Sequence, residues 1–205
     1  MALGSFVYIG DVANLNDARY CAGMGVDLVG FNLNPNDEKS LNPAQFKEIS
    51  AWISGVKIVG EFGELSPDEV KLSLDHFNID YLLISDESKI HEFAQSDKPL
   101  ILRIIVNEET NNNLAAILNY CSGSVDFFLI ESEHGNLDEE EINFIRSYSS
   151  QFPIILGYGV NIENAKTIVN ELKLKGISLK GSSEMRPGHK NFDELADILE
   201  VLEID

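Results

Sequence analysis

The sequence predicts a single-domain (β/α)₈ barrel that spans residues 1–205. Short apolar runs alternate with helix-like patterns from end to end, which is typical of parallel strands joined by right-handed crossovers. The alternation repeats eight times, with about 25 residues in each unit, and eight such units close on themselves as a barrel. An open doubly wound sheet is the main alternative, but it commonly has five or six strands.

The predicted strands are near-continuous apolar runs, as expected for strands that are covered on both faces. No linker, composition break or low-complexity segment divides them, so one domain is expected. In chain order the strands are Ser5–Gly10, Asp27–Asn32, Val56–Phe62, Ile79–Ile84, Leu100–Val106, Val125–Ile130, Pro153–Leu156 and Gly176–Lys180.

The predicted helices follow the strands, and several carry start signals. Asn42 precedes a proline at the first helical position. Ser66 and Glu69 form a capping box. Asn161 is the expected cap of the seventh helix. In chain order the helices are Asn14–Gly25, Pro43–Ile53, Pro67–His76, Ser88–Ala94, Thr110–Tyr120, Asp138–Ser149, Val160–Val169 and Phe192–Leu202.

Composition and charge narrow the class of function. Hydrophobic residues make up 44% and charged residues 24%, as in ordinary globular proteins. The net charge of −19 argues against binding to nucleic acid or to an anionic membrane surface, because both are polyanions. The first residues lack the basic and apolar regions of a signal peptide, and no apolar run approaches the roughly 20 residues of a spanning helix. A cytoplasmic location is therefore expected.

Cys21 and Cys121 lie in apolar, helix-like segments. Two such residues make neither a disulfide framework nor a metal site, so buried free thiols are expected.

The active face of a (β/α)₈ barrel lies at the carboxyl ends of its strands. Polar side chains that follow the predicted strands are therefore the candidates for function. They are Asp11, Asn32, Asn34, Lys39, Glu61, Asp86, Asn107, Glu131, Tyr158 and Lys180.

Two glycine turns after the last two strands, G-Y-G-V and K-G-S-S, predict a phosphate site. Backbone N–H groups at such turns and at a helix start attract anions, and barrels often bind phosphate at these two loops. The alternative is that the glycines only make tight turns. The predicted phosphate-binding residues are Gly157, Gly159, Val160, Lys180, Gly181, Ser182 and Ser183.

An ordered set of motifs resembles the phosphoribosylanthranilate isomerase family. The motifs are Y-I-G-D-V-A-N-L-N-D-A, V-G-F-N-L, V-G-E-F, D-F-F-L-I-E-S, I-L-G-Y-G-V-N-I-E-N-A and S-S-E-M-R-P-G-H-K-N. The resemblance implies a small barrel, monomeric or homodimeric, that performs an Amadori rearrangement of a phosphorylated small molecule in tryptophan biosynthesis. It implies neither metal nor cofactor. The family uses a cysteine base at the end of its first strand and an aspartate acid at the end of its sixth.

This sequence departs from that pattern at both catalytic positions. Gly10 stands where the resemblance places the cysteine base, and Glu131 stands at the aspartate acid. A glycine has no side chain and cannot exchange a proton. Asp11 is the nearest substitute, but neighbouring strand residues point to opposite faces, so it serves only if the strand ends early or bulges. Otherwise Asp11 is a turn or capping residue.

Three basic residues have open roles. Lys39 stands where the resemblance places a substrate-binding arginine, but it lacks the bidentate fork of arginine and is alternatively a solvated loop charge. Lys180 pairs with phosphate, pairs with Glu131 or is exposed. Arg103 lies inside an apolar strand and needs a carboxylate partner, for which Glu61 or Asp80 is expected.

Two functional hypotheses follow. The first is an isomerase of the family type that uses Glu131 with Asp11 or Lys180, although the loss of the base at Gly10 makes the normal activity doubtful. The second is a non-catalytic or regulatory paralogue that binds a phosphorylated ligand.

Overall fold

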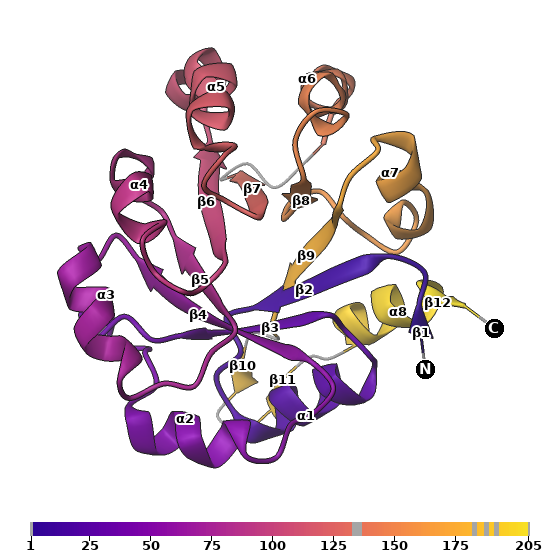
Figure 1. Ribbon diagram of the computed structural model, residues 1–205. Coiled ribbons are helices and arrows are strands. Elements are labelled where there is room, and N and C mark those ends of the chain that lie inside the picture. The colour runs from indigo at the N-terminus through magenta and orange to yellow at the C-terminus, as the bar shows by residue number, and fades with distance from the viewer. Residues whose placement is uncertain (1, 133–136, 182–183, 187–188, 191–192, 205) are drawn as a thin grey trace.

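The computed structural model describes residues 2–132, 137–181, 184–186, 189–190 and 193–204. Eight parallel strands, β2 to β9, close into a barrel in the order of the sequence. Figure 1 shows these strands at the centre and the helices around them. The predicted single-domain (β/α)₈ barrel is therefore confirmed, and the open sheet is excluded.

The barrel strands lie close to the predicted ranges. The sixth strand is shifted toward the carboxyl end, so that Glu131 lies inside it and not after it. The barrel strands are β2 Phe6–Gly10, β3 Leu28–Asn32, β4 Lys57–Gly63, β5 Tyr81–Ile84, β6 Leu100–Val106, β7 Phe127–Ser132, β8 Ile154–Leu156 and β9 Gly176–Lys180.

The helices keep the predicted order. The predicted helix at 88–94 is in fact a 3₁₀ turn, η1, followed by a short helix. The capping boxes begun by Asn42 and Ser66 are both present. The helical elements are α1 Leu15–Gly23, α2 Pro43–Ser50, α3 Pro67–Leu74, η1 Glu87–Lys89, α4 Ile90–Phe93, α5 Glu108–Cys121, α6 Glu139–Ser149, α7 Ala165–Glu171 and α8 Asp193–Val201.

The seventh helix begins later than predicted, at Ala165 and not at Val160. The side chain of Asn161 accepts hydrogen bonds from the backbone N–H groups of Glu163 and Asn164, so it caps a separate turn before the helix. Asn161 therefore acts as a cap, as predicted, but for this turn and not for the regular helix, which begins after it and is shorter than predicted.

Two short antiparallel pairs were not predicted. β1 (Ala2–Leu3) pairs with β12 (Glu203–Ile204), which holds the two ends of the chain together beside α8. β10 (Glu184–Arg186) pairs with β11 (His189–Lys190) after the last barrel strand. Runs of two or three residues carry no periodic signal, so sequence patterns do not reveal them.

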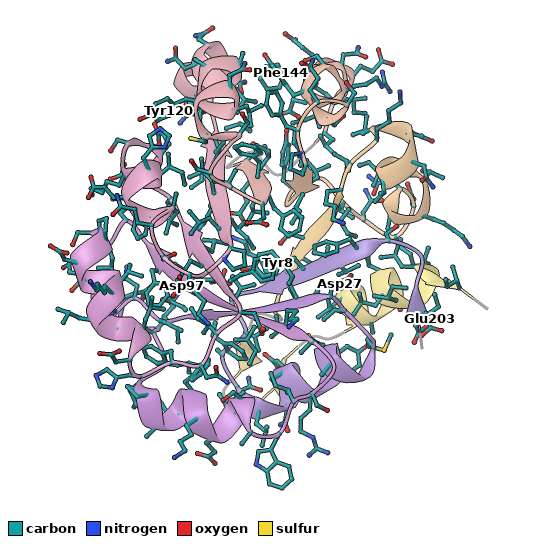
Figure 2. The ribbon with its side chains drawn as sticks, in the orientation of Figure 1. Tyr8, Asp27, Asp97, Tyr120, Phe144 and Glu203 are labelled. Carbon is teal, nitrogen blue, oxygen red and sulfur yellow. The ribbon has the colours of Figure 1, made fainter. Side chains whose placement is uncertain are left out.

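Apolar side chains fill the barrel interior up to a polar top layer. At the amino-terminal end, Tyr81 stacks against Phe127 and Phe6 packs against it at a tilt, with ring centroids 5.9 and 5.3 Å from it. Figure 2 places Tyr8 at the centre of the barrel, inside the ring of helices. The buried interior cluster consists of Tyr8, Leu28, Val59, Leu83, Ile101, Leu129 and Ile155. The next inward positions along the strands bring glycine and charged side chains to the barrel mouth.

Candidate active site

The carboxyl ends of the strands surround two adjoining cavities. A small one of about 20 Å³ lies at the centre of the mouth, and a larger one of about 820 Å³ extends over β2, β3 and β4. Both cavities are lined by Asp11, Glu61, Leu83 and Arg103. The larger volume is within the range of small-molecule sites, so these shared residues are the ones that a bound ligand would meet.

Glu61 is held by neutral donors. Its Oε1 accepts a hydrogen bond from the Tyr8 hydroxyl at 2.6 Å and another from the Asp11 backbone N–H at 3.1 Å. The Glu61 side chain is partly exposed, toward the cavities. We call Tyr8, Glu61 and the Asp11 backbone the neutral wall of the mouth.

The neutral wall changes how Glu61 binds protons. Removal from water raises the pKa of Glu61 from 4.5 to about 7, and the Asp11 charge acts in the same direction. The Tyr8 and Asp11 hydrogen bonds and the charge of Arg103 favour the carboxylate and limit the rise. A carboxyl group with a pKa near 7 can both give and take a proton at neutral pH.

Two glycines make room for the neutral wall. A Cβ on Gly30 would lie 2.0 Å from Glu61 Oε1 and 2.3 Å from the Tyr8 hydroxyl, so a side chain at position 30 would displace the pair. A Cβ on Gly10 would lie 3.1 Å from Glu61 Oε1. The Glu61 carboxyl therefore occupies the space into which a side chain at position 10 would extend.

Glu131, in contrast, is held by cations. Arg103 Nε donates to Glu131 Oε2 at 2.6 Å, and Lys180 Nζ lies 3.6 Å from Glu131 Oε1. Glu131 is buried, and a Cβ on Gly157 would lie 2.9 Å from its Cγ. We call Arg103, Glu131 and Lys180 the ionic wall. The expected partners of Arg103, Glu61 and Asp80, were wrong, because its ion pair is made with Glu131; Asp80 pairs with Lys57 at the other end of β4.

Asp11 does reach the mouth. β2 ends at Gly10, and Asp11 adopts φ = 55°, a left-handed conformation that few non-glycine residues take. The strand ends at the predicted residue, so Asp11 lies outside it and the alternation of strand faces does not fix the direction of its side chain. Its carboxylate is about half-exposed and lies 3.9 Å from Lys180 Nζ, so it stands at the rim beside the ionic wall.

Each of the two predicted phosphate turns uses one backbone donor within the barrel. The Gly157 N–H donates to the Ile130 carbonyl and the Gly181 N–H to the Gly10 carbonyl, both at 2.8 Å. These two N–H groups therefore donate within the barrel, and any anion at the predicted site would be bound by other groups of the two turns.

The loop that follows β8, directly after Gly157, is tightly packed. Gly159 has φ = 66°, and a Cβ there would lie 2.4 Å from Leu137 Cγ. Tyr158 is buried, and removal from water raises the pKa of its hydroxyl. Val160 is partly exposed in the same loop. Ser182 and Ser183 lie outside the described residues, so that part of the prediction is untested.

Lys39 lines the larger cavity beside Asp37, Asn32 and Asn34. Its backbone N–H donates to Asp37, and the same carboxylate accepts from the Asn32 side chain, which together lower the pKa of Asp37. The position of Lys39 fits either of its predicted roles, a ligand contact or a solvated loop charge.

The structure thus brings together Asp11, Glu61, Glu131 and Lys180 from the predicted set. Sequence patterns missed Tyr8 as a member of the site, because it lies in an apolar strand. A two-residue period along F-V-Y-I-G places Phe6, Tyr8 and Gly10 on one face, and this signal could have found it.

The prediction of buried thiols is confirmed, since Cys21 and Cys121 are both buried and neither is part of a disulfide. Within the described residues, no group of three or more His, Cys, Asp or Glu side chains is placed to hold a metal ion. No helix in that part of the chain has the length and apolar character needed to cross a membrane.

Comparisons with known proteins point to one family. A family model described as N-(5'phosphoribosyl)anthranilate (PRA) isomerase matches residues 9–201. An N-(5'-phosphoribosyl)anthranilate isomerase from Chloroherpeton thalassium is 26% identical over 190 residues, which cover 88% of this chain and 87% of that protein. The enzyme of the same name from Thermotoga petrophila is 22% identical over 192 residues, covering 92% and 94%.

Solved structures agree on the fold. The crystal structure of phosphoribosyl anthranilate isomerase from Thermotoga maritima has a TM-score of 0.79 at 21% identity and covers 97% of this chain and 98% of its own. A complex of such an isomerase with reduced 1-(o-carboxyphenylamino)-1-deoxyribulose 5-phosphate has a TM-score of 0.77 at 21% identity, with the same coverage.

Proposed function

The chain belongs to the N-(5'-phosphoribosyl)anthranilate isomerase family, and from that premise we propose that it is an isomerase of a small phosphorylated sugar derivative, with altered proton-transfer groups. The main support is the barrel mouth, where two carboxyl groups line one cavity: Glu61, which is bonded to neutral donors, and Glu131, which is bonded to cations. Sites in which two acidic groups have opposed environments commonly divide the acid and base roles between them.

The proposed ligand follows from the family. One solved relative binds reduced 1-(o-carboxyphenylamino)-1-deoxyribulose 5-phosphate, and a cavity of about 820 Å³ accommodates a molecule of that size. Because the Gly157 and Gly181 amides bond within the barrel, the phosphate is held by other groups of the same loops, with Gly159, Val160, Ser182 and Ser183 as candidates and Lys180 and Lys39 as nearby cations.

The proposed reaction is the Amadori type of isomerisation. It requires an acid that opens the sugar ring and a base that removes a proton from C2, and each such group contributes roughly 10²–10⁴-fold to the rate. Glu131 is the candidate acid. Asp11 is the candidate base that the sequence offers, because Gly10, at the position of the family's base, has no side chain. The proposed reaction uses no metal or cofactor. We further propose that the protein is cytoplasmic and is a monomer or homodimer.

The second candidate function is a non-catalytic protein that binds a phosphorylated ligand. The observation in its favour is the ionic wall, because the Glu131 carboxylate is already bonded to Arg103 and lies beside Lys180, so cations of the chain itself occupy its oxygens.

Complementation separates the two candidates. The gene is expressed in a tryptophan auxotroph that lacks this isomerase, beside Glu131→Ala and the matched control Glu139→Ala on the first turn of α6. Growth with the wild type and the control, but not with Glu131→Ala, is the expected result. Absence of growth with soluble wild-type protein that still binds reduced 1-(o-carboxyphenylamino)-1-deoxyribulose 5-phosphate would favour the non-catalytic function.

A further inference from the structure

We infer that Glu61, hydrogen-bonded to Tyr8, is the group that removes the substrate proton at the centre of the barrel mouth. This inference rests on the proposed isomerase function and assigns a catalytic residue on β4, a strand to which the sequence assigned no catalytic role.

The first support is position. Glu61 Oε1 lies where a side chain from position 10 would extend, since a Cβ on Gly10 would be only 3.1 Å away. Both Glu61 and Asp11 line the two cavities, but the Glu61 side chain is only partly exposed, whereas the Asp11 carboxylate is about half-exposed at the rim. A base that reaches the reacting carbon from the centre of the mouth is better placed than one in solvent.

The second support is that this part of the fold is built around the pair. Gly30 leaves no room for a Cβ, which would lie 2.0 Å from Glu61 Oε1 and 2.3 Å from the Tyr8 hydroxyl. Asp11 has a left-handed backbone conformation, with φ = 55°, and its N–H donates to the same Glu61 Oε1. An unusual backbone conformation, a glycine and two donors therefore converge on one carboxyl oxygen, which is typical of a positioned functional group.

The third support is chemical. A carboxyl group that is ordinarily a weak base becomes a stronger one when removal from water raises its pKa to about 7. Glu61 remains partly exposed at the cavity, so a ligand can reach it.

The step balances without any further reactant. The Glu61 carboxylate takes the proton from C2 of the ring-opened iminium form. The C2–H electron pair becomes the second bond between C1 and C2, and the C=N pair returns to nitrogen. The protonated Glu61 then gives the proton to C1, while the C2 hydroxyl loses its proton to water and becomes the carbonyl. Tyr8 is a positioning residue, because it acts through its bond to Glu61.

The test measures turnover of N-(5'-phosphoribosyl)anthranilate as a function of pH. Glu61→Gln keeps the shape and an oxygen that accepts from Tyr8, and it is expected to lower kcat/KM by roughly 10²–10⁴-fold. In the wild type, kcat/KM is expected to rise with pH and to level off above about 7, because the base form is required. The control is Asp80→Asn, the same kind of change at the opposite end of the barrel.

Two further variants move the pH profile in opposite directions. Asp11→Asn removes a charge that raises the pKa of Glu61, so its profile is expected to shift to lower pH. Tyr8→Phe removes a hydrogen bond that lowers this pKa, so its profile is expected to shift to higher pH. A merely structural role for either residue would change the rate without these opposed shifts.

The outcomes separate the inference from the proposed function. Wild-type turnover that Glu61→Gln leaves intact, with folding verified by circular dichroism, would overturn the inference alone. A loss of turnover in Asp11→Asn as large as that expected for Glu61→Gln, with no shift in the profile, would assign the base to Asp11 instead. A wild-type protein without turnover would overturn the proposed function and this inference with it.

Discussion

Glu61 and Glu131 are the same residue type on two walls of one cavity, and their surroundings differ in charge. Glu61 is bonded to a phenol hydroxyl and a backbone N–H, both neutral donors. Glu131 is bonded to Arg103 and lies beside Lys180, both cations. The comparison shows how differently one residue type is held in one cavity: removal from water raises the pKa of Glu61 to about 7 against the opposing effect of its two hydrogen bonds, whereas the Glu131 carboxylate is paired with cations.

The origin of the difference lies in the register of the strands. In the register of β6 and β7, Arg103 lies opposite Leu129, and Glu131 is two residues further along β7. At that level the inward side chains of the flanking strands, Arg103 on β6 and Lys180 on β9, are positively charged. On the other side, the positions that flank Glu61 are Gly10 and Gly30, which have no side chains. Glycines leave space for a buried hydrogen bond, whereas cations fill the space and neutralise the carboxylate.

Breaking the ionic wall is expected to have the largest effect on stability. Arg103→Met leaves Glu131 buried beside Lys180 without its closest cation among the described residues. Removing one member of a buried pair costs about 2–4 kcal/mol when the residual exposure of Arg103 is allowed for. The measurement is the free energy of unfolding from urea titrations. The control is Lys57→Met, which breaks a pair of exposed side chains at the far end of the barrel and is expected to cost much less than Arg103→Met.

The double variant Arg103→Met with Glu131→Gln sharpens this test, because it removes the buried charge together with its partner. It is expected to recover part of the lost stability. Equal losses in Arg103→Met and Lys57→Met would contradict the view that Glu131 depends on a buried ion pair.

The ionic wall also shows what the sequence could and could not predict. The barrel, its eight units and the strands Leu100–Val106 and Gly176–Lys180 follow from apolar periodicity alone. The partner of Arg103 does not, because the tilt of the strands decides which inward residues meet at the same level. The two phosphate turns show the same limit: sequence locates the glycines, but not whether the amides of Gly157 and Gly181 bond within the barrel.

The neutral wall can be tested through the pH dependence of stability. The pKa of Glu61 is about 7 in the folded chain and near 4.5 when unfolded, so the folded chain binds more protons between these values. Its stabilising contribution is therefore complete below pH 4.5 and is lost as the pH rises through 7. At about 1.36 kcal/mol per pKa unit, the loss amounts to roughly 3 kcal/mol at most.

Glu61→Gln cannot ionise, so this loss should be absent in the variant. The difference in unfolding free energy between wild type and variant is expected to change by about 2–3 kcal/mol from pH 5 to pH 8, with the variant the more stable at pH 8. Using the difference cancels the other titrating groups. A difference that stays constant with pH would mean that Glu61 has no raised pKa. A variant that is more stable but inactive would match a site that sacrifices stability for chemistry.

Lys180 gives the smallest expected effect and marks the edge of the ionic wall. It is about half-exposed and lies 3.6 Å from Glu131 and 3.9 Å from Asp11, so water and salt screen both pairs. Lys180→Met is expected to change the unfolding free energy by no more than about 0.5 kcal/mol, and less at high salt. If Lys180 contributes mainly to ligand binding, the same variant weakens the binding of reduced 1-(o-carboxyphenylamino)-1-deoxyribulose 5-phosphate, measured by calorimetry. A stability loss close to that of Arg103→Met would instead make Lys180 an equal structural partner of Glu131.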